Sequence, residues 1–126
     1  MNSSELNDRI LLKELVDNVS ILADRKDFVN QVKLFTLNAV SKTYAGGKSV
    51  LKLQGREEMI AAVDSFFKNY ETIYHFNGQQ VLTINGNTAN GTSYCMVTLI
   101  AMEQGEKMKT TIGAVYHDSF VWENSS

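Results

Sequence analysis

The second half of the sequence constrains the fold most, because two turn signals there separate long runs of residues without proline. An Asn-Gly-Asn sequence occupies residues 85–87 and a Gln-Gly pair occupies residues 104–105. Glycine and asparagine tolerate the positive φ that tight hairpin turns require. The runs around these turns are therefore predicted to be long antiparallel strands. They cover residues 73–76 and 79–84, 89–102, and 108–122.

Residues 108–122 alternate with a period of two, which directs successive side chains to opposite faces of a sheet. This alternation places Tyr116, Asp118 and Trp122 on one face. His117 is predicted to point to the opposite face.

The first half of the sequence has the apolar spacing of helices. Apolar residues recur every three or four positions and predict a helix over about residues 4–24. A second helix is predicted over about residues 27–35, with Asp27 as its N-cap, and a third follows Gly55. Alternation around a Gly-Gly turn predicts a β-hairpin over about residues 40–53. This order predicts an α+β fold, in which three helices from the N-terminal half pack on one face of a strongly curved antiparallel sheet.

Length and charge narrow the class of protein. The chain has 126 residues with 44% hydrophobic content, which favours one domain over residues 1–126 with its own core. A net charge of −2 offers no basic surface, so we expect no nucleic-acid partner. We also expect no export signal and no membrane-spanning segment. Cys95 is the single cysteine, and a reducing cytoplasm is the expected location.

Several segments carry a family resemblance. Residues 21–28 read Ile-Leu-Ala-Asp-Arg-Lys-Asp-Phe and are followed by Leu-Phe-Thr at 34–36, while residues 116–121 read Tyr-His-Asp-Ser-Phe-Val. These segments, in this order, resemble SnoaL-like and scytalone dehydratase-like domains of the nuclear transport factor 2-like superfamily, which has the cystatin-like fold. The resemblance covers almost the whole chain. It implies a cone-shaped α+β barrel that encloses an apolar pocket.

The resemblance also implies a catalytic pair. In dehydratase members, an aspartate at the end of the first helix faces a histidine on the strand after the third helix, and these positions match Asp24 and His75. A neutral imidazole can abstract a proton from carbon while a carboxylate orients it. Taken without the resemblance, Asp24 could simply end a helix and His75 could be a packed strand residue.

The sequence departs from the family pattern at a second pocket histidine. The matching segment, residues 91–94, reads Gly-Thr-Ser-Tyr, so that Ser93 and Tyr94 are the nearest substitutes. A tyrosine hydroxyl can donate a hydrogen bond to a developing enolate oxygen. Tyr44 and Tyr116 are therefore further candidates for substrate binding, beside Ser93 and Tyr94.

The end of the sequence differs as well. Family members continue past the segment at 116–121 into a final strand, which here is expected to be short or missing. An uncovered strand edge is normally protected in natural proteins. A homodimer formed through the sheet is therefore the expected assembly, in keeping with the dimers of the family.

No metal site or cofactor is expected, because His75 and His117 are far apart in sequence and no other metal-ligand spacing is present. The resemblance implies a lyase or isomerase, dehydratase-like or polyketide cyclase-like, that abstracts a proton from a small apolar or cyclic molecule. The alternative is a non-catalytic ligand-binding or dimerisation module of the same fold.

Overall fold

A computed structural model describes residues 3–123 of the chain and has the predicted α+β architecture. Its elements, in chain order, are α1 (Ser3–Asp24), α2 (Phe28–Val32), β1 (Val40–Ala45), β2 (Lys48–Gln54), α3 (Arg56–Phe67), β3 (Thr72–Asn85), β4 (Thr88–Glu103) and β5 (Glu106–Val121). No helix among residues 3–123 is long and apolar enough to cross a bilayer.

The strands form two sheets. β1 and β2 form a hairpin of their own, and β3, β4 and β5 form an antiparallel meander in that order. The two runs predicted at 73–76 and 79–84 are parts of one strand, interrupted by an irregularity in register between Asn77 and Gln80. Within the described residues β5 lies at an edge of its sheet.

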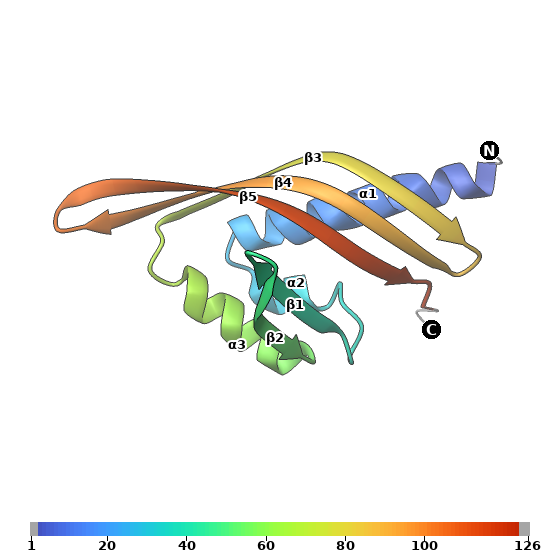
Figure 1. The fold of residues 1–126 in the computed structure, drawn as a ribbon, viewed down its shortest axis with the longest axis horizontal. Helices are drawn as coiled ribbons and strands as arrows, with labels where there is room; N and C mark the ends of the chain where they lie inside the picture. The colour runs from blue at the N-terminus through green and yellow to red at the C-terminus, as the bar shows by residue number, and fades with distance from the viewer. Residues whose placement is uncertain (1–2, 124–126) are drawn as a thin grey trace.

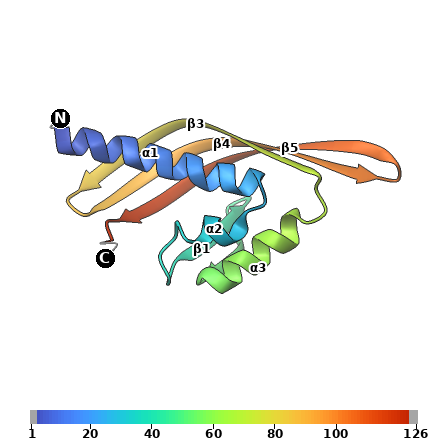
Figure 2. The same cartoon turned by 180° about the vertical axis from the view of Figure 1, so that it is seen from behind.

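The helices lie on one side of the long sheet. Figure 1 shows the meander as an arch with α1 running beneath β3, and with α2, α3 and the β1–β2 hairpin further below. Figure 2 shows the same order from behind. Alternate residues of β4 from Ala89 to Ala101 are buried, whereas Tyr94 and Met96 are exposed. The meander therefore has a covered inner face and an uncovered outer face.

The core lies where β3 and β4 meet α3. Ile73, Cys95, Val97 and Leu99 form a buried cluster against which Phe67, Tyr70 and Tyr116 pack. Leu99 is only 1% exposed. This cluster fixes the middle of the inner face, on which the predicted site residues of β3 also lie.

The corner between α1 and α2 differs in part from the prediction. Asp27 caps α2 as expected, because its carboxylate accepts a hydrogen bond from the Asn30 amide at 3.3 Å. The helix ends at Val32 rather than near residue 35. Just beyond this end, Arg56 Nε of α3 donates to the Phe35 carbonyl at 2.9 Å.

Candidate active site on the inner face

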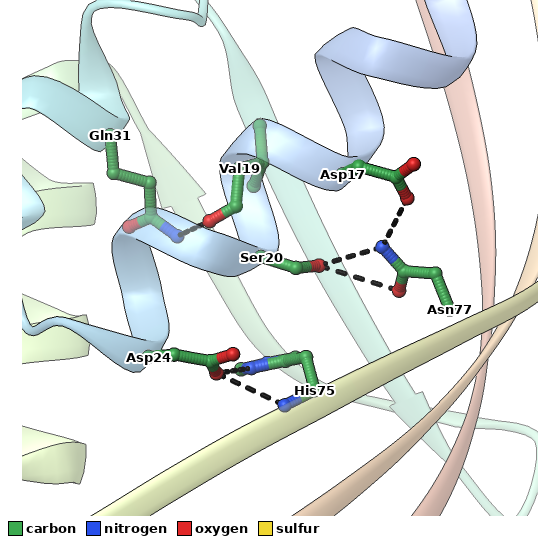
Figure 3. Close-up of polar contacts among 7 residues, drawn as sticks. All are labelled: Asp17, Val19, Ser20, Asp24, Gln31, His75 and Asn77. Atoms are coloured by element: carbon green, nitrogen blue, oxygen red, sulfur yellow. Dashed lines mark hydrogen bonds and ion pairs between the residues drawn. The ribbon is translucent and has the colours of Figure 1, made fainter.

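Asp24 and His75 meet between the end of α1 and the first half of β3. The Asp24 Oδ1 atom lies 2.6 Å from His75 Nδ1, and it also accepts a hydrogen bond from the His75 backbone amide at 3.0 Å. Figure 3 shows both contacts. The side chain of His75 is 9% exposed and that of Asp24 is 23% exposed. The aspartate thus holds both the ring and the backbone of the histidine.

Local structure explains why the pair forms. Asp24 is the last residue of α1, and the chain turns directly after it through Lys26, which has a positive φ of 57°. His75 lies opposite Val97 in the β3–β4 register and shares the inner face with Ile73. The ring of Phe67 meets the imidazole edge-on, with ring centroids 6.4 Å apart. The histidine is therefore held between a carboxylate and an aromatic ring.

A second polar group that the sequence analysis missed lies beside this pair. Asn77 Nδ2 donates to Asp17 Oδ1 at 3.1 Å and to Ser20 Oγ at 3.0 Å, as Figure 3 shows. Burial raises the pKa of the Asp17 carboxyl, but hydrogen bonds from Lys13 and Asn77 lower it by more. The net shift of the Asp17 pKa is therefore downward. Asp17, Ser20 and Asp24 are spaced by three and four residues, which places them on one helix face. That spacing was the signal available in the sequence.

Tyr116 and Ser93, both predicted as substrate-binding residues, lie together farther along the inner face. They are directly opposite each other in the β4–β5 register. The Tyr116 hydroxyl is in hydrogen-bonding contact with the Cys95 thiol, and burial together with this neighbour raises the pKa of Tyr116 above its ordinary value. The phenol therefore stays protonated and can donate. Burial likewise raises the pKa of Cys95, so its thiol stays protonated.

The structure does not bring the other two predicted tyrosines to the pair. Tyr94 is 52% exposed and points to the outer face, because it follows Ser93 in a strand whose side chains alternate. Tyr44 is 61% exposed on the β1–β2 hairpin. His117 is on the outer face as predicted, where its Nδ1 lies 3.2 Å from Thr92 Oγ1.

The predicted apolar pocket at Asp24 and His75 stays a prediction. One hollow that the structure shows lies at the tip of the β4–β5 hairpin, around Glu103 and Met108. Another lies on the outer face, around Thr92, His117 and Ser119. Neither hollow is lined by the pair.

The described part of the chain offers no set of metal-ligating side chains. Residues 3–123 contain no group of three or more His, Cys, Asp and Glu side chains placed to hold a metal ion. The Asp24–His75 pair supplies two donor residues. Acid–base chemistry is what this arrangement can perform.

Comparison with known proteins agrees with the observed fold. The profile of the SnoaL-like domain matches residues 4–125, almost the whole chain. The chain belongs to the SnoaL-like family. No curated protein matches this SnoaL-like chain in sequence.

Three solved structures from Novosphingobium aromaticivorans share the fold of this SnoaL-like protein. A candidate scytalone dehydratase is 15% identical, with a TM-score of 0.83, and the match covers 98% of this chain and 80% of that one. The β subunit of a candidate aromatic-ring-hydroxylating dioxygenase is 14% identical, with a TM-score of 0.79 and coverage of 98% and 85%. A nuclear transport factor 2-like protein with a cystatin-like fold is 21% identical, with a TM-score of 0.68 and coverage of 94% and 74%. At these identities the likeness establishes the fold alone.

Proposed function

We propose that this protein is a cofactor-independent lyase or isomerase, in which His75 abstracts a proton from carbon and Asp24 orients it. The observation that carries the proposal is the 2.6 Å contact between Asp24 Oδ1 and His75 Nδ1. A carboxylate on Nδ1 favours the tautomer whose proton is on that nitrogen, which leaves Nε2 as the base. The same carboxylate stabilises the imidazolium that forms. The dehydratase-like relative supports this reaction class.

The reaction begins with removal of a proton from a carbon next to a carbonyl group. The proton moves to His75 Nε2, and the electron pair of the broken C–H bond is delocalised onto the carbonyl oxygen. In a lyase reaction this enolate expels a hydroxyl group from the β carbon, and the imidazolium returns its proton to make the departing water. In an isomerase reaction the imidazolium returns the proton to another carbon. In this proposal the Tyr116 side chain, which packs against the same apolar cluster, donates a hydrogen bond to the enolate oxygen.

The surroundings favour a small and largely apolar ligand. The His75 ring is only 9% exposed and lies beside Phe67, with the apolar cluster of Ile73, Val97 and Leu99 on the same sheet face. Removing water from such a site strengthens the electrostatic interaction between imidazolium and carboxylate. A cyclic ketone or hydroxy ketone fits this chemistry.

The test is hydrogen–deuterium exchange at the α carbon of 2-tetralone, followed by proton NMR in deuterated buffer. The parent should accelerate exchange over buffer alone, and His75→Ala should lower that acceleration by about 10²- to 10⁴-fold. Asp24→Asn should lower it as well, because the wrong tautomer is then favoured. His117→Ala on the outer face is the control and should keep the parental rate. Binding of 2-tetralone without exchange would replace the enzyme with the ligand-binding module.

We also propose a homodimer formed through the outer face of the meander. Phe76 and Met96 are neighbours in register there and are 66% and 54% exposed, and Tyr94 and Val115 beside them are 52% and 54% exposed. Contiguous apolar side chains on a surface mark an interaction site. Met96→Lys should convert the dimer to a monomer in sedimentation velocity, whereas a parent that sediments as a monomer would refute the assembly.

A cytoplasmic location completes the proposal. Cys95 is a free and buried thiol, and a reducing compartment is where such cysteines persist as thiols.

A further inference from the structure

Three polar side-chain atoms in the described part of the chain are buried without a hydrogen-bond partner: Arg9 Nε, Gln80 Nε2 and Ser93 Oγ. They belong to one region of the inner face. Gln80 and Ser93 lie directly opposite each other in the β3–β4 register. Arg9 of α1 donates from Nη1 to the Leu82 carbonyl at 3.2 Å, two residues along the strand from Gln80. We call these three residues the donor cluster.

The donor cluster carries an energetic cost that the folded chain does not offset. A buried polar atom without a partner has lost its hydrogen bonds to water, and native structures normally pair such atoms. Ser93 is only 2% exposed, so bulk water does not reach its side chain freely. A partner that completes the cluster when bound would remove this cost.

The chemistry of the three atoms specifies that partner. The Gln80 amide nitrogen and the Arg9 Nε can only donate hydrogen bonds, and the Ser93 hydroxyl can do so as well. A group that satisfies all three must be an acceptor. A carboxylate, with two oxygens, can accept from all three donors, and a carbonyl oxygen, with two lone pairs, can accept from two of them.

We propose that the donor cluster binds a hydrogen-bond-accepting oxygen of the ligand, at the end remote from the reacting carbon. This proposal rests on the proposed function, which identifies the reacting carbon as the one that loses its proton to His75. His75 lies opposite Val97 and Gln80 lies opposite Ser93, four residues away along β4. At about 3.3 Å per residue the separation is roughly 13 Å, too far for one functional group to contact both sites. The substrate class is therefore an extended molecule with oxygen functions at both ends.

Two carboxylates bear on the donor cluster, and one of them, Glu5, pairs with Arg9 Nη2 at 3.0 Å. Asp118 lies opposite Gly91, beside the cluster in register. Burial raises the pKa of the Asp118 carboxyl, although nearby His117 acts in the opposite direction. Burial thus disfavours a fixed negative charge at Asp118 that would repel the ligand oxygen.

The test compares ligands of one shape that differ at one atom. Acetophenone carries a carbonyl oxygen where isopropenylbenzene carries a methylene group, and benzoate carries a carboxylate. Dissociation constants are measured by amide NMR titration of the whole chain. The parent should bind acetophenone about five- to tenfold more tightly than isopropenylbenzene, the ratio expected for one net hydrogen bond. The ratio should fall to about one in both Ser93→Ala and Gln80→Met, two variants that remove donors from different strands.

Two controls separate this proposal from the catalytic one. Ser119→Ala removes a hydroxyl that donates to Asn90 Oδ1 on the exposed face, and it should keep the parental ratio. His75→Ala should keep the ratio as well, since the donor cluster is a different site. Arg9→Met distinguishes the two oxygen sources, because it should weaken benzoate more than acetophenone.

The proposal fails if the parent binds acetophenone and isopropenylbenzene equally, or binds none of the three probes. It also fails if the ratio survives in Ser93→Ala and Gln80→Met but is lost in His75→Ala, since the oxygen would then be held at the catalytic pair. Loss of exchange activity in His75→Ala with an intact binding ratio would support both sites independently. Loss of the ratio in Ser93→Ala and Gln80→Met, with no exchange of 2-tetralone by the parent, would support the donor cluster alone.

Discussion

Two groups of polar side chains on the inner face differ in how completely the chain pairs them. The first joins α1 to the first half of β3 and consists of Asp17, Ser20, Asp24, His75 and Asn77, which hydrogen-bond to one another in two sets. The second is the donor cluster, in which three buried atoms have no partner within residues 3–123. The paired group connects α1 to the sheet, whereas we propose that the donor cluster binds a ligand.

Substitutions in the two groups should change the stability of the fold with opposite signs. Removing one member of a satisfied buried pair strands its partner and destabilises the fold. Removing a polar atom that has no partner relieves a cost, so stability should rise while binding is lost. The free energy of unfolding should therefore fall in variants of the paired group and rise in variants of the donor cluster.

Asp24→Ala should have the largest effect. It leaves both the His75 ring nitrogen and the His75 backbone amide without a partner. The free energy of unfolding should therefore fall by about 2–3 kcal/mol. Asp27→Ala at the next corner position removes two exposed bonds, which come from the backbone amide and the side-chain amide of Asn30, and it should cost about 1 kcal/mol. Urea denaturation measures both. Equal losses in the two variants would mean that the pair adds nothing beyond a helix cap.

Asn77→Ala should come next. The change leaves Ser20, which is 7% exposed, without its partner, while Asp17 retains Lys13. We expect a loss of about 1–2 kcal/mol in the same assay. Asn90→Ala on the exposed outer face is the matched amide control and should change stability by under about 0.5 kcal/mol. A loss no greater than that of Asn90→Ala would remove Asn77 from the paired group.

The strands and their facing residues were predictable because period-two alternation and turn residues are local signals. Ser93 and Tyr94 are consecutive, so alternation alone separates their faces, and the outward position of Tyr94 follows from the strand prediction itself. The end of α2 was not predictable in the same way. The segment just after the helix is bound by Arg56, whose guanidinium reaches Phe35 across 21 residues of sequence, and no local signal predicts this contact.

The catalytic pair was proposed from family resemblance, and the structure shows the two side chains in contact. The donor cluster had no such signal. Counting by two from His75 would place residues 77, 79 and 81 on the inner face. The irregularity between Asn77 and Gln80 shifts the count by one, so that Gln80, Leu82 and Ile84 are the less exposed residues instead. A single extra residue thus decides which amide belongs to the donor cluster.

Asp118→Asn should change how stability depends on pH. Because burial raises the pKa of Asp118 in the folded state above 3.8, the folded chain holds this proton more tightly than the unfolded chain. Its contribution to stability is present below pH 3.8 and is lost as pH rises through the folded pKa. The advantage of the asparagine variant over the parent should therefore grow with rising pH and then level off. Denaturation between about pH 3.5 and pH 8 measures this. A difference between the variant and the parent that is the same at every pH would contradict it.

Ser93→Ala should have the smallest effect on stability and the opposite sign to Asp24→Ala. The hydroxyl is buried without a partner, so removing it should raise the free energy of unfolding by up to about 1 kcal/mol. Ser20→Ala is the matched control, because Ser20 is a buried serine that does bond with Asn77, and it should be destabilising. Differential urea unfolding of the two variants, without ligand, compares them directly. If both serines destabilise equally when replaced, the Ser93 hydroxyl is already paired in solution by a bound water, and the donor cluster loses its capacity for a ligand oxygen. If Ser93→Ala stabilises the chain while Ser20→Ala destabilises it, the Ser93 hydroxyl lowers the stability of the ligand-free protein. Such a loss of stability is common at functional sites.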